Sequence, residues 1–326
     1  MISLGIESTA HTFGIGIITD KGKVLANVLD AYKTETGGLI PVELRKHHEA
    51  VKSKVLQDAL EQANIKLKDI DLVTFSQGPG IAPALKVGLK TAKEIASKFK
   101  VPLVGVNHCV AHLEIGKLLT KAHDPVLLYT SGANTQIIAY ESGKYRIFGE
   151  TLDQGVGNFI DAFGRYMGLG FPGGPKIEKL ALQSKNYIEL PYVVKGMDVS
   201  FSGILTNLKI KYDSKKYDVN DLCYSLQETV FAMLVEVSER AMAHTGKIEL
   251  VLGGGVACNK RLQEMCSIMC EERNAKFFVP ENQFLVDNAA MIAWQGILQK
   301  QEASKKYNEL DIKPYQRTDD ISATWR

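Results

Sequence analysis

A short pattern occurs twice in this chain and divides it into two similar halves. Residues 4–12 and 127–135 each consist of an apolar run followed by small polar residues, and each leads to a second apolar run and a Gly-Lys turn. Small polar residues make good turns, and the N–H groups and hydroxyls at such a turn also suit a phosphate or carboxylate. Because the pattern heads both halves, it predicts a duplicated fold with an anion-binding hairpin in each half.

The rest of the chain alternates between strand-like apolar runs and helical periodicity. Such alternation predicts an α/β fold with parallel or mixed sheets covered by helices. A length of 326 residues exceeds one comfortable core, so we expect two domains. The predicted strands are residues 3–6, 14–18, 72–76, 103–106, 126–129, 136–140 and 250–252, and the predicted helices are 49–63, 87–98, 109–119, 158–167, 177–183 and 221–244.

The composition is that of an ordinary soluble globular protein, with 45% hydrophobic and 23% charged residues. A net charge of +2 neither supports nor excludes a nucleic-acid partner, because a local basic patch is enough to bind phosphates. No apolar run is long enough to span a membrane, and the first residues lack a secretory signal. We therefore expect a cytoplasmic protein without a membrane partner.

The cysteine pattern argues against a disulfide framework. The five cysteines are odd in number, and none forms a C-x-x-C pair. Cys266 and Cys270 are four residues apart in a helical stretch, a spacing that favours packing thiols over metal ligands.

Two histidines, His108 and His112, are spaced to lie one turn apart on the same helix face. Neutral imidazoles at this spacing can share one metal ion, although a pair of solvent-facing helix histidines is the alternative. The H-E-x-x-H pattern of metalloproteases needs a glutamate after the first histidine, and Cys109 stands there. The pair therefore predicts a metal site without the hydrolytic base.

A glycine-rich segment at residues 250–259 has the sequence of a strand, a tight turn at Gly253, Gly254 and Gly255, and a helix start. Glycines let a ligand approach the backbone, and a helix N-terminus favours negative charge. A β-α turn without a ligand is the alternative. A P-loop is excluded, because the chain has no G-x-x-x-x-G-K-[ST].

Two anion-binding hairpins and a glycine turn on two α/β halves resemble the actin-like ATPase superfamily, in which nucleotide lies between two RNase-H-like domains. The motifs Gly-Ile-Glu-Ser-Thr, Ser-Gln-Gly-Pro-Gly, His-Cys-Val-Ala-His, Tyr-Thr-Ser-Gly-Ala-Asn-Thr, Phe-Pro-Gly-Gly-Pro and Ser-Phe-Ser-Gly follow in order from residue 5 to residue 203. Together they resemble the universal tRNA threonylcarbamoyladenosine transferase family. Residues 129–135 and 317–319 resemble its archaeal and eukaryotic branch, the catalytic subunit of the KEOPS complex.

The resemblance implies a metal site and a nucleotide site. The metal, one Fe²⁺ with Zn²⁺ and Mg²⁺ as alternatives, would be held by His108, His112, Tyr129 and Asp287. The family's contacts to the substrate, which contains an adenine nucleotide, fall on Tyr129, Thr130, Ser131, Gly132, Ala133, Asp161, Gly174, Glu178 and Asn259.

Some residues leave alternatives open or depart from the family pattern. Without the resemblance, Asp161 and Glu178 would be interpreted as surface acids of helices. Val286 stands where the family has glycine, and since a β-branched residue disfavours positive φ, this questions the loop before Asp287. Val42 follows Pro41 where the family has arginine.

The resemblance also implies a domain division and a reaction. One RNase-H-like domain would comprise residues 1–124 and about 290–326, and the second, with a helical insertion, residues 125–289. The chain would transfer a threonylcarbamoyl group from threonylcarbamoyl-AMP, made by a separate synthase, to N6 of adenosine 37 in tRNAs that read codons beginning with A. Its partners would be tRNA and the KEOPS subunits, including the small kinase.

Other interpretations remain at this stage. An actin-fold ATPase or small-molecule kinase is the main alternative, and a metalloprotease is less favoured. The lysine-rich residues 209–216 are either an RNA contact or a solvated face.

Overall fold

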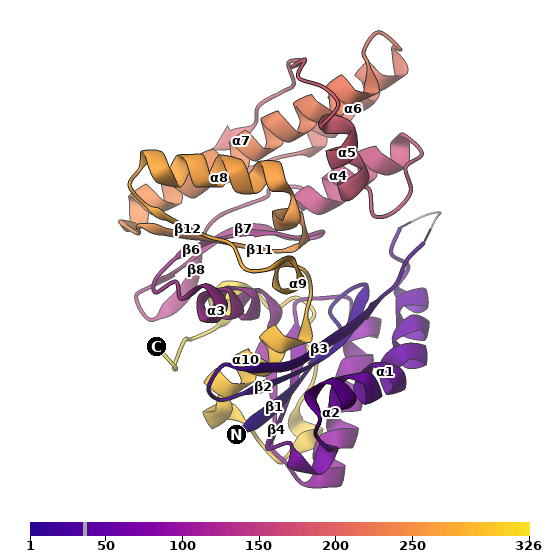
Figure 1. The fold of residues 1–326 in the computed structure, drawn as a ribbon, viewed down its shortest axis with the longest axis vertical. Coiled ribbons are helices and arrows are strands. Elements are labelled where there is room, and N and C mark those ends of the chain that lie inside the picture. Colours follow the sequence, from indigo (N-terminus) through magenta and orange to yellow (C-terminus); the bar gives the residue numbers. More distant parts are fainter. Residues whose placement is uncertain (35–37) are drawn as a thin grey trace.

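Two five-stranded sheets form the framework of the computed structural model, which describes residues 1–34 and 38–326 (Figure 1). The first sheet has the order β3-β2-β1-β4-β5, and the second has the order β8-β7-β6-β11-β12. The first comprises β1 (Ile2–Glu7), β2 (Thr12–Thr19), β3 (Val24–Ala31), β4 (Leu72–Gly78) and β5 (Leu103–Asn107). The second comprises β6 (Val126–Thr130), β7 (Thr135–Glu141), β8 (Lys144–Glu150), β11 (Glu249–Gly253) and β12 (Lys276–Phe278), and a small hairpin is formed by β9 (Val194–Lys195) and β10 (Asp198–Val199).

The two large sheets have the same topology. In each, the first three strands in chain order are antiparallel neighbours, as in β1-β2-β3 and β6-β7-β8. The other two strands then run parallel to the first strand or to each other, as in β1-β4-β5 and β6-β11-β12. The duplicated α/β fold predicted from the repeated pattern is confirmed, and each repeated segment forms the tip of the first hairpin in its sheet.

Helices cover both sheets. On the first sheet, α1 and α2 pack against its strands and α10 packs against β1, β2 and β4, while α7 packs against β6 and β7 of the second. Helix α3 follows β5 and contacts strands of both sheets, so it lies between the two halves (Figure 1). The helices are α1 (Pro41–Ala63), α2 (Ala82–Phe99), α3 (His108–Thr120), α4 (Val156–Tyr166), α5 (Gly174–Ala181), α6 (Ser202–Asp213), α7 (Val219–Thr245), α8 (Lys260–Glu272), α9 (Asn282–Leu285) and α10 (Ala289–Leu298).

Helix α10 packs unusually close to the first sheet because two glycines face it. Gly5 and Gly16 are paired across β1 and β2. A Cβ on Gly5 would lie 2.3 Å from the Ala293 nitrogen, and one on Gly16 would lie 2.2 Å from the Ala290 nitrogen. Only glycine allows this approach. It fixes the start of α10, and with it the chain segment just before that helix.

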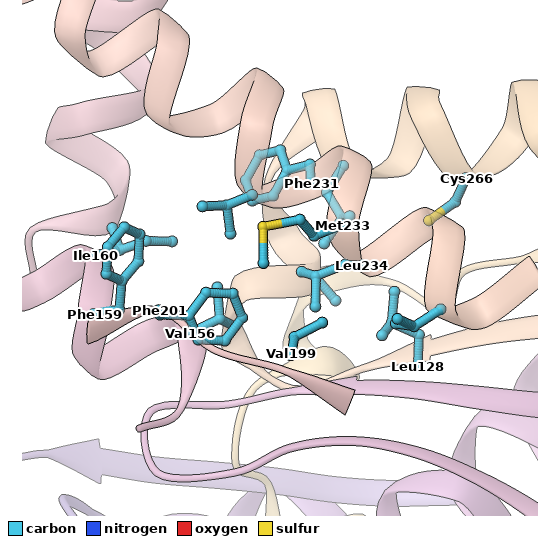
Figure 2. Close-up of a cluster of buried hydrophobic side chains, with 14 of the residues drawn as sticks. Leu128, Val156, Phe159, Ile160, Val199, Phe201, Phe231, Met233, Leu234 and Cys266 are labelled. Carbon is cyan, nitrogen blue, oxygen red and sulfur yellow. The ribbon is translucent and has the colours of Figure 1, made fainter. Parts of the chain in front are cut away.

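The larger core lies between the second sheet and helices α4, α6, α7 and α8. This cluster contains Val156 and Phe159 of α4, Phe201 just before α6, Leu234 of α7 and Leu128 of β6 (Figure 2). Both cysteines of α8, Cys266 and Cys270, are buried in the same cluster. The prediction that they are packing thiols is confirmed.

Among the described helices, none combines the length and the apolar composition that a membrane span requires.

Candidate active site

Three side chains that can ligate a metal meet between the two halves. His108 and His112 lie on α3, and Asp287 lies just before α10. One ligand atom from each residue lies within 4.8 Å of the others. Oδ1 of Asp287 is 3.3 Å from Nε2 of His108 and 3.7 Å from Nε2 of His112. The i, i+4 spacing therefore brings both imidazoles to the same carboxylate.

Two asparagine caps fix these ligands in place. The side chain of Asn107 accepts hydrogen bonds from the backbone nitrogens of Cys109 and Val110 at 3.0 and 3.1 Å, so α3 begins at His108. The side chain of Asn288 accepts a hydrogen bond from the Met291 nitrogen at 3.0 Å, so α10 begins at Ala289, two residues after Asp287. The ligands are thus held at two helix starts rather than on free loops.

Tyr129 joins this group from β6 of the second sheet. Its hydroxyl lies 3.1 Å from Nε2 of His108, and its ring centroid lies 5.0 Å from that of His112. Both ring nitrogens of His112 are buried and make no hydrogen bond with any residue that the structure describes. Buried nitrogens without a partner are costly unless a ligand satisfies them. Two imidazoles, a carboxylate and a phenolic oxygen are donors that suit a divalent transition metal, so the residues fit such an ion.

Glu7, at the end of β1, orients His108. Its Oε2 is 2.9 Å from Nδ1 of His108, and its Oε1 accepts hydrogen bonds from the Thr9 nitrogen and hydroxyl at 2.6 and 2.5 Å. A carboxylate on one imidazole nitrogen directs the other nitrogen toward a metal and raises its basicity. This role was not predicted from the sequence. The available signal was a carboxylate at the end of an apolar strand, a residue type that is rarely buried without a partner.

In this cluster, opposite charges on the histidines and carboxylates offset the cost of burying each of them. Burial opposes protonation of His108, but the Glu7 and Asp287 carboxylates outweigh it and hold the pKa of His108 well above its usual value. Burial raises the pKa of Asp287, but its interactions with the His108 and His112 imidazoles outweigh this effect and hold that pKa well below the usual range. Burial lowers the pKa of His112 and raises that of Tyr129. A bound cation would displace protons from such a group.

The second hairpin tip lies next to this cluster in the chain. Its turn is closed by a hydrogen bond from the Ser131 nitrogen to the Asn134 carbonyl at 2.8 Å, while Gly132 and Ala133 are exposed. Among the described residues, the nitrogens of Gly132 and Ala133 donate no hydrogen bond. Helix α4 packs directly behind the tip, and the Gly157 nitrogen donates to the Ser131 carbonyl at 3.0 Å. Free N–H groups at a turn backed by rigid structure form a candidate anion site.

The other predicted ligand residues lie in the second half, within α4, at the start of α5 and within it, and at the start of α8. Oδ1 of Asp161 on α4 accepts a hydrogen bond from the Gly173 nitrogen at 2.7 Å, next to Gly174 at the start of α5. Burial raises the pKa of Asp161, and the N–H groups of Gly173 and Gly174 oppose the rise. Oε1 of Glu178 on α5 accepts a hydrogen bond from the Lys260 nitrogen at 2.9 Å.

Asn259 serves as the N-cap of α8. Its oxygen accepts hydrogen bonds from the nitrogens of Arg261 and Leu262 at 2.9 and 3.3 Å, and its amide nitrogen donates to Gln227 at 2.6 Å. Both ends of this side chain therefore have partners within the protein, and its contact with a ligand stays a prediction.

His11, on the first hairpin tip, connects the two groups of residues. Its Nδ1 lies 4.0 Å from Oδ2 of Asp287, and its ring contacts Phe171 edge-on at a centroid distance of 5.9 Å. Phe171 precedes Gly173, which contacts Asp161. The sequence did not single out His11 as a site residue, because nothing in its local pattern distinguishes it from a turn residue.

Val286 does not distort the loop before Asp287. It adopts φ −72° and ψ 169°, an extended conformation that a β-branched residue accommodates. The departure from glycine therefore leaves the cluster intact.

The comparisons with known proteins agree with one another. A family model described as tRNA N6-adenosine threonylcarbamoyltransferase matches residues 23–294. A protein of that name from Thermococcus kodakarensis is 56% identical over 326 residues and covers 100% of both chains. A protein from Methanococcus vannielii named probable bifunctional tRNA threonylcarbamoyladenosine biosynthesis protein is 50% identical, over 100% of this chain and 59% of its own length.

Solved structures with low sequence identity share the fold. HypF from T. kodakarensis superimposes with a TM-score of 0.66 at 15% identity, over 95% of this chain and 49% of that one. Component A of the (R)-2-hydroxyglutaryl-CoA dehydratase of Acidaminococcus fermentans gives a TM-score of 0.57 at 17% identity, over 91% of this chain and 99% of that one. The fold is therefore that of the actin-like ATPases.

Proposed function

The chain belongs to the tRNA N6-adenosine threonylcarbamoyltransferase family, and we propose that its site moves a threonylcarbamoyl group from threonylcarbamoyl-AMP to N6 of adenosine 37 in tRNAs that read codons beginning with A. One observation carries this proposal. The Tyr129 hydroxyl lies beside His108, and the turn that follows Tyr129 in the chain exposes the N–H groups of Gly132 and Ala133, which donate no hydrogen bond among the described residues. A mixed anhydride of a carbamate with AMP has a carbonyl and a phosphate joined by one oxygen, which suits two adjacent subsites.

The metal subsite would comprise His108, His112, Tyr129 and Asp287, with one Fe²⁺, or alternatively Zn²⁺ or Mg²⁺. When bound, this ion would polarise the threonylcarbamoyl carbonyl as a Lewis acid. Glu7 keeps Nδ1 of His108 occupied, so that Nε2 stays directed into the subsite.

The phosphate subsite would comprise Thr130, Ser131, Gly132 and Ala133. N–H groups fixed at this turn would hold the phosphate and stabilise the charge that develops on AMP as it leaves. The adenosine of AMP would extend toward Asp161, Gly174, Glu178 and Asn259. The carboxylates are suited to a ribose, because each can accept hydrogen bonds from hydroxyl groups.

The transfer itself exchanges one bond for another. N6 of the tRNA adenosine attacks the carbonyl carbon, the bond from that carbon to the phosphate oxygen breaks, and AMP leaves with the bonding pair. A proton leaves N6. No nucleophilic side chain is needed, and Cys109 is a poor one, because burial raises the pKa of its thiol.

The domain division and the partners belong to the same proposal. Residues 1–124 with about 290–326 would form one unit, since α10 packs on the first sheet, and residues 125–289 the other. We assign the protein to the cytoplasm, with the KEOPS subunits, including the small kinase, as partners and a separate enzyme supplying the adenylate.

Reconstitution tests the proposed function. The chain is mixed with tRNA, the KEOPS partners, the adenylate-forming enzyme, threonine, bicarbonate and ATP, and the nucleosides of digested tRNA are separated by mass spectrometry. Threonylcarbamoyladenosine is the expected product at position 37. Its absence, when the same partners succeed with a known active catalytic subunit, contradicts the proposal. The ATPase and protease alternatives predict instead a phosphorylated product or a cleaved peptide without tRNA.

A further inference from the structure

The segment from the end of α4 to the start of α7 is basic. Residues 162–217 contain nine Lys or Arg and four Asp or Glu, whereas the whole chain has 39 and 37. The excess is concentrated on α6 and the turn after it, at Lys209, Lys211, Lys215 and Lys216. Within the described parts of the chain, none of these four lysines forms a salt bridge. Their charge is therefore not neutralised by the protein.

Tyrosines alternate with these lysines. The ammonium group of Lys209 lies 4.9 Å from the centre of the Tyr166 ring, and that of Lys211 lies 4.9 Å from the Tyr217 ring. Both rings stay open to solvent, with exposed fractions of 42% and 39%. We call the surface formed by these residues the Lys-Tyr face. Its members are Tyr166, Lys209, Lys211, Tyr212, Lys215, Lys216 and Tyr217.

The interior of the Lys-Tyr face is ordered by packing. Tyr212 lies edge-on to Tyr166 at a centroid distance of 6.0 Å and beneath the Lys215 ammonium group at 4.3 Å. The carboxylate of Asp213 accepts a hydrogen bond from the Tyr166 hydroxyl at 2.5 Å. The rings are thus held in place, which reduces the entropy lost when a ligand stacks on them.

Helix α4 connects this face to the candidate phosphate subsite. It starts against the hairpin tip, where the Gly157 nitrogen bonds to Ser131, and it ends at Tyr166. Its 11 residues, at a rise of about 1.5 Å each, span roughly 16 Å. Figure 1 shows α4, α5 and α6 grouped together at one end of the second half. A few nucleotides cover such a distance, given a phosphate about every 3.4 Å along one strand of a duplex.

We propose that the Lys-Tyr face binds the anticodon arm of tRNA while the target adenosine occupies the site, an inference that rests on the proposed function. Unpaired lysines attract phosphates, and exposed aromatic rings stack on unpaired bases of RNA loops. An acidic protein surface would use the ammonium groups but not the ring faces. The combination therefore favours RNA, and it gives a chain of net charge +2 a local attraction for tRNA.

Charge-removing variants test the lysines. In the complete chain, Lys209, Lys211, Lys215 and Lys216 are replaced together by Gln, which preserves length and helix propensity. The matched control replaces by Gln four exposed lysines of the first half that form no salt bridge with any described residue, Lys54, Lys68, Lys86 and Lys90. The affinity for a tRNA transcript is measured over a range of salt concentrations. We expect the first variant to lose at least about 10-fold in affinity and the slope of log K against log salt to fall by about 3, and the control to bind like the wild type.

Ring-removing variants test for RNA rather than protein as the occupant. Tyr166→Leu with Tyr217→Leu should weaken tRNA binding about 30-fold or more, because each of the two stacked bases contributes roughly 1–3 kcal/mol, and should leave the salt slope unchanged. Circular dichroism and calorimetry with AMP confirm that the fold and the nucleotide subsite persist. Unchanged tRNA affinity in both variants overturns the inference. It is also overturned if the variants lose affinity for a KEOPS subunit while their affinity for tRNA stays the same.

The wild type separates this inference from the function on which it rests. Suppose that the wild type forms threonylcarbamoyladenosine with its partners and that the lysine variant binds and modifies tRNA equally well. This result refutes tRNA binding by the Lys-Tyr face but leaves the proposed function standing. A wild type that neither binds tRNA nor forms the product refutes the proposed function and the inference with it.

Discussion

The two hairpin tips come from the same repeated pattern but present different surfaces. When the repeats are aligned, Glu7 of the first tip corresponds to Thr130 of the second, and Thr9 corresponds to Gly132. The Glu7 carboxylate accepts a hydrogen bond from the Thr9 nitrogen, whereas the Gly132 nitrogen donates no hydrogen bond among the described residues. The first tip is therefore closed by its own carboxylate, and the second is open to an anion from outside.

This difference shows how one duplicated unit provides two kinds of chemistry. The buried carboxylate of the first tip also bonds His108, so that this half orients a proposed metal ligand. The second tip has no carboxylate at that position, and its exposed turn keeps two N–H groups that suit an anion. A single residue type at one aligned position thus separates the half that orients His108 from the half with the open turn.

The largest expected effect comes from removing the metal ligands themselves. Replacing both His108 and His112 by Ala should abolish binding of the metal, because losing two of four ligands removes several kcal/mol from an affinity of the order of 10 kcal/mol. Elemental analysis of the purified protein measures this. His244→Ala, an exposed histidine at the end of α7, is the control and should keep the wild-type metal content. Equal metal content in the wild type and the double variant would show that the two histidines do not bind the metal.

A carboxylate at the second tip should close it in the manner of the first. Thr130→Glu should weaken AMP binding by about 100-fold, since a negative charge would take the Gly132 N–H and repel the phosphate, and charge-assisted hydrogen bonds contribute about 1.5–3 kcal/mol each. Thr130→Val keeps the shape without the charge and should lose much less AMP affinity than Thr130→Glu. Calorimetry gives the affinities, and thermal melting confirms folding. Tight AMP binding by a folded Thr130→Glu protein would contradict the comparison of the tips.

Opening the first tip should lower the affinity for the metal without abolishing metal binding. Glu7→Gln retains an acceptor for Nδ1 of His108 but removes the charge, so metal affinity should fall about 10-fold, the lower end for partners that orient a ligand. Glu7→Ala removes both the acceptor and the charge, so its metal affinity should fall further. Competition with a chelator measures the affinities. Equal affinities in all three proteins would show that Glu7 serves only to close the turn.

The sequence predicted the duplicated fold well because it rests on local patterns. Strand periodicity and the paired turns located β1, β2, β6 and β7 to within two residues. Helix α10 was missed because its residues are almost uniformly apolar and buried on all sides, which leaves no amphipathic signal. The start of α1 was placed eight residues too late, although Pro41 is a residue typical of a first helical turn.

The site was predictable only in part, for a physical reason. The i, i+4 spacing of His108 and His112 is a local feature of one helix, so the sequence shows it directly. Glu7 reaches His108 across 101 residues, and Asp287 is brought to both histidines by the packing of α10 on the glycines of the first sheet. Such contacts depend on tertiary structure, and only the family resemblance pointed to Asp287.

The smallest expected effect concerns the insertion that distinguishes the second half. Between β8 and β11 the chain adds α4, α5 and α6, and Asp153 ties the start of α6 to this region. Its carboxylate accepts hydrogen bonds from the Ser200 hydroxyl at 2.6 Å and from the Phe201 and Ser202 nitrogens at 3.0 and 2.8 Å. Burial raises the pKa of Asp153, but these hydrogen bonds outweigh it and hold the pKa well below its usual value.

A lowered pKa in the folded state means that Asp153 adds stability above its unfolded pKa of about 3.9, and that this stability is lost as the pH falls through the folded value. Asp153→Asn should therefore lower the free energy of unfolding by about 1 kcal/mol at pH 7, a modest figure because water screens this exposed group. The difference from the wild type should shrink below about pH 4, where the unfolded carboxyl is protonated. Urea unfolding at several pH values measures this difference. Asp58→Asn on α1, whose carboxylate makes no hydrogen bond or ion pair among the described residues, is the control and should change little at any pH. A difference that does not vary with pH would mean that the shape of the Asp153 side chain, and not its charge, holds α6 in place.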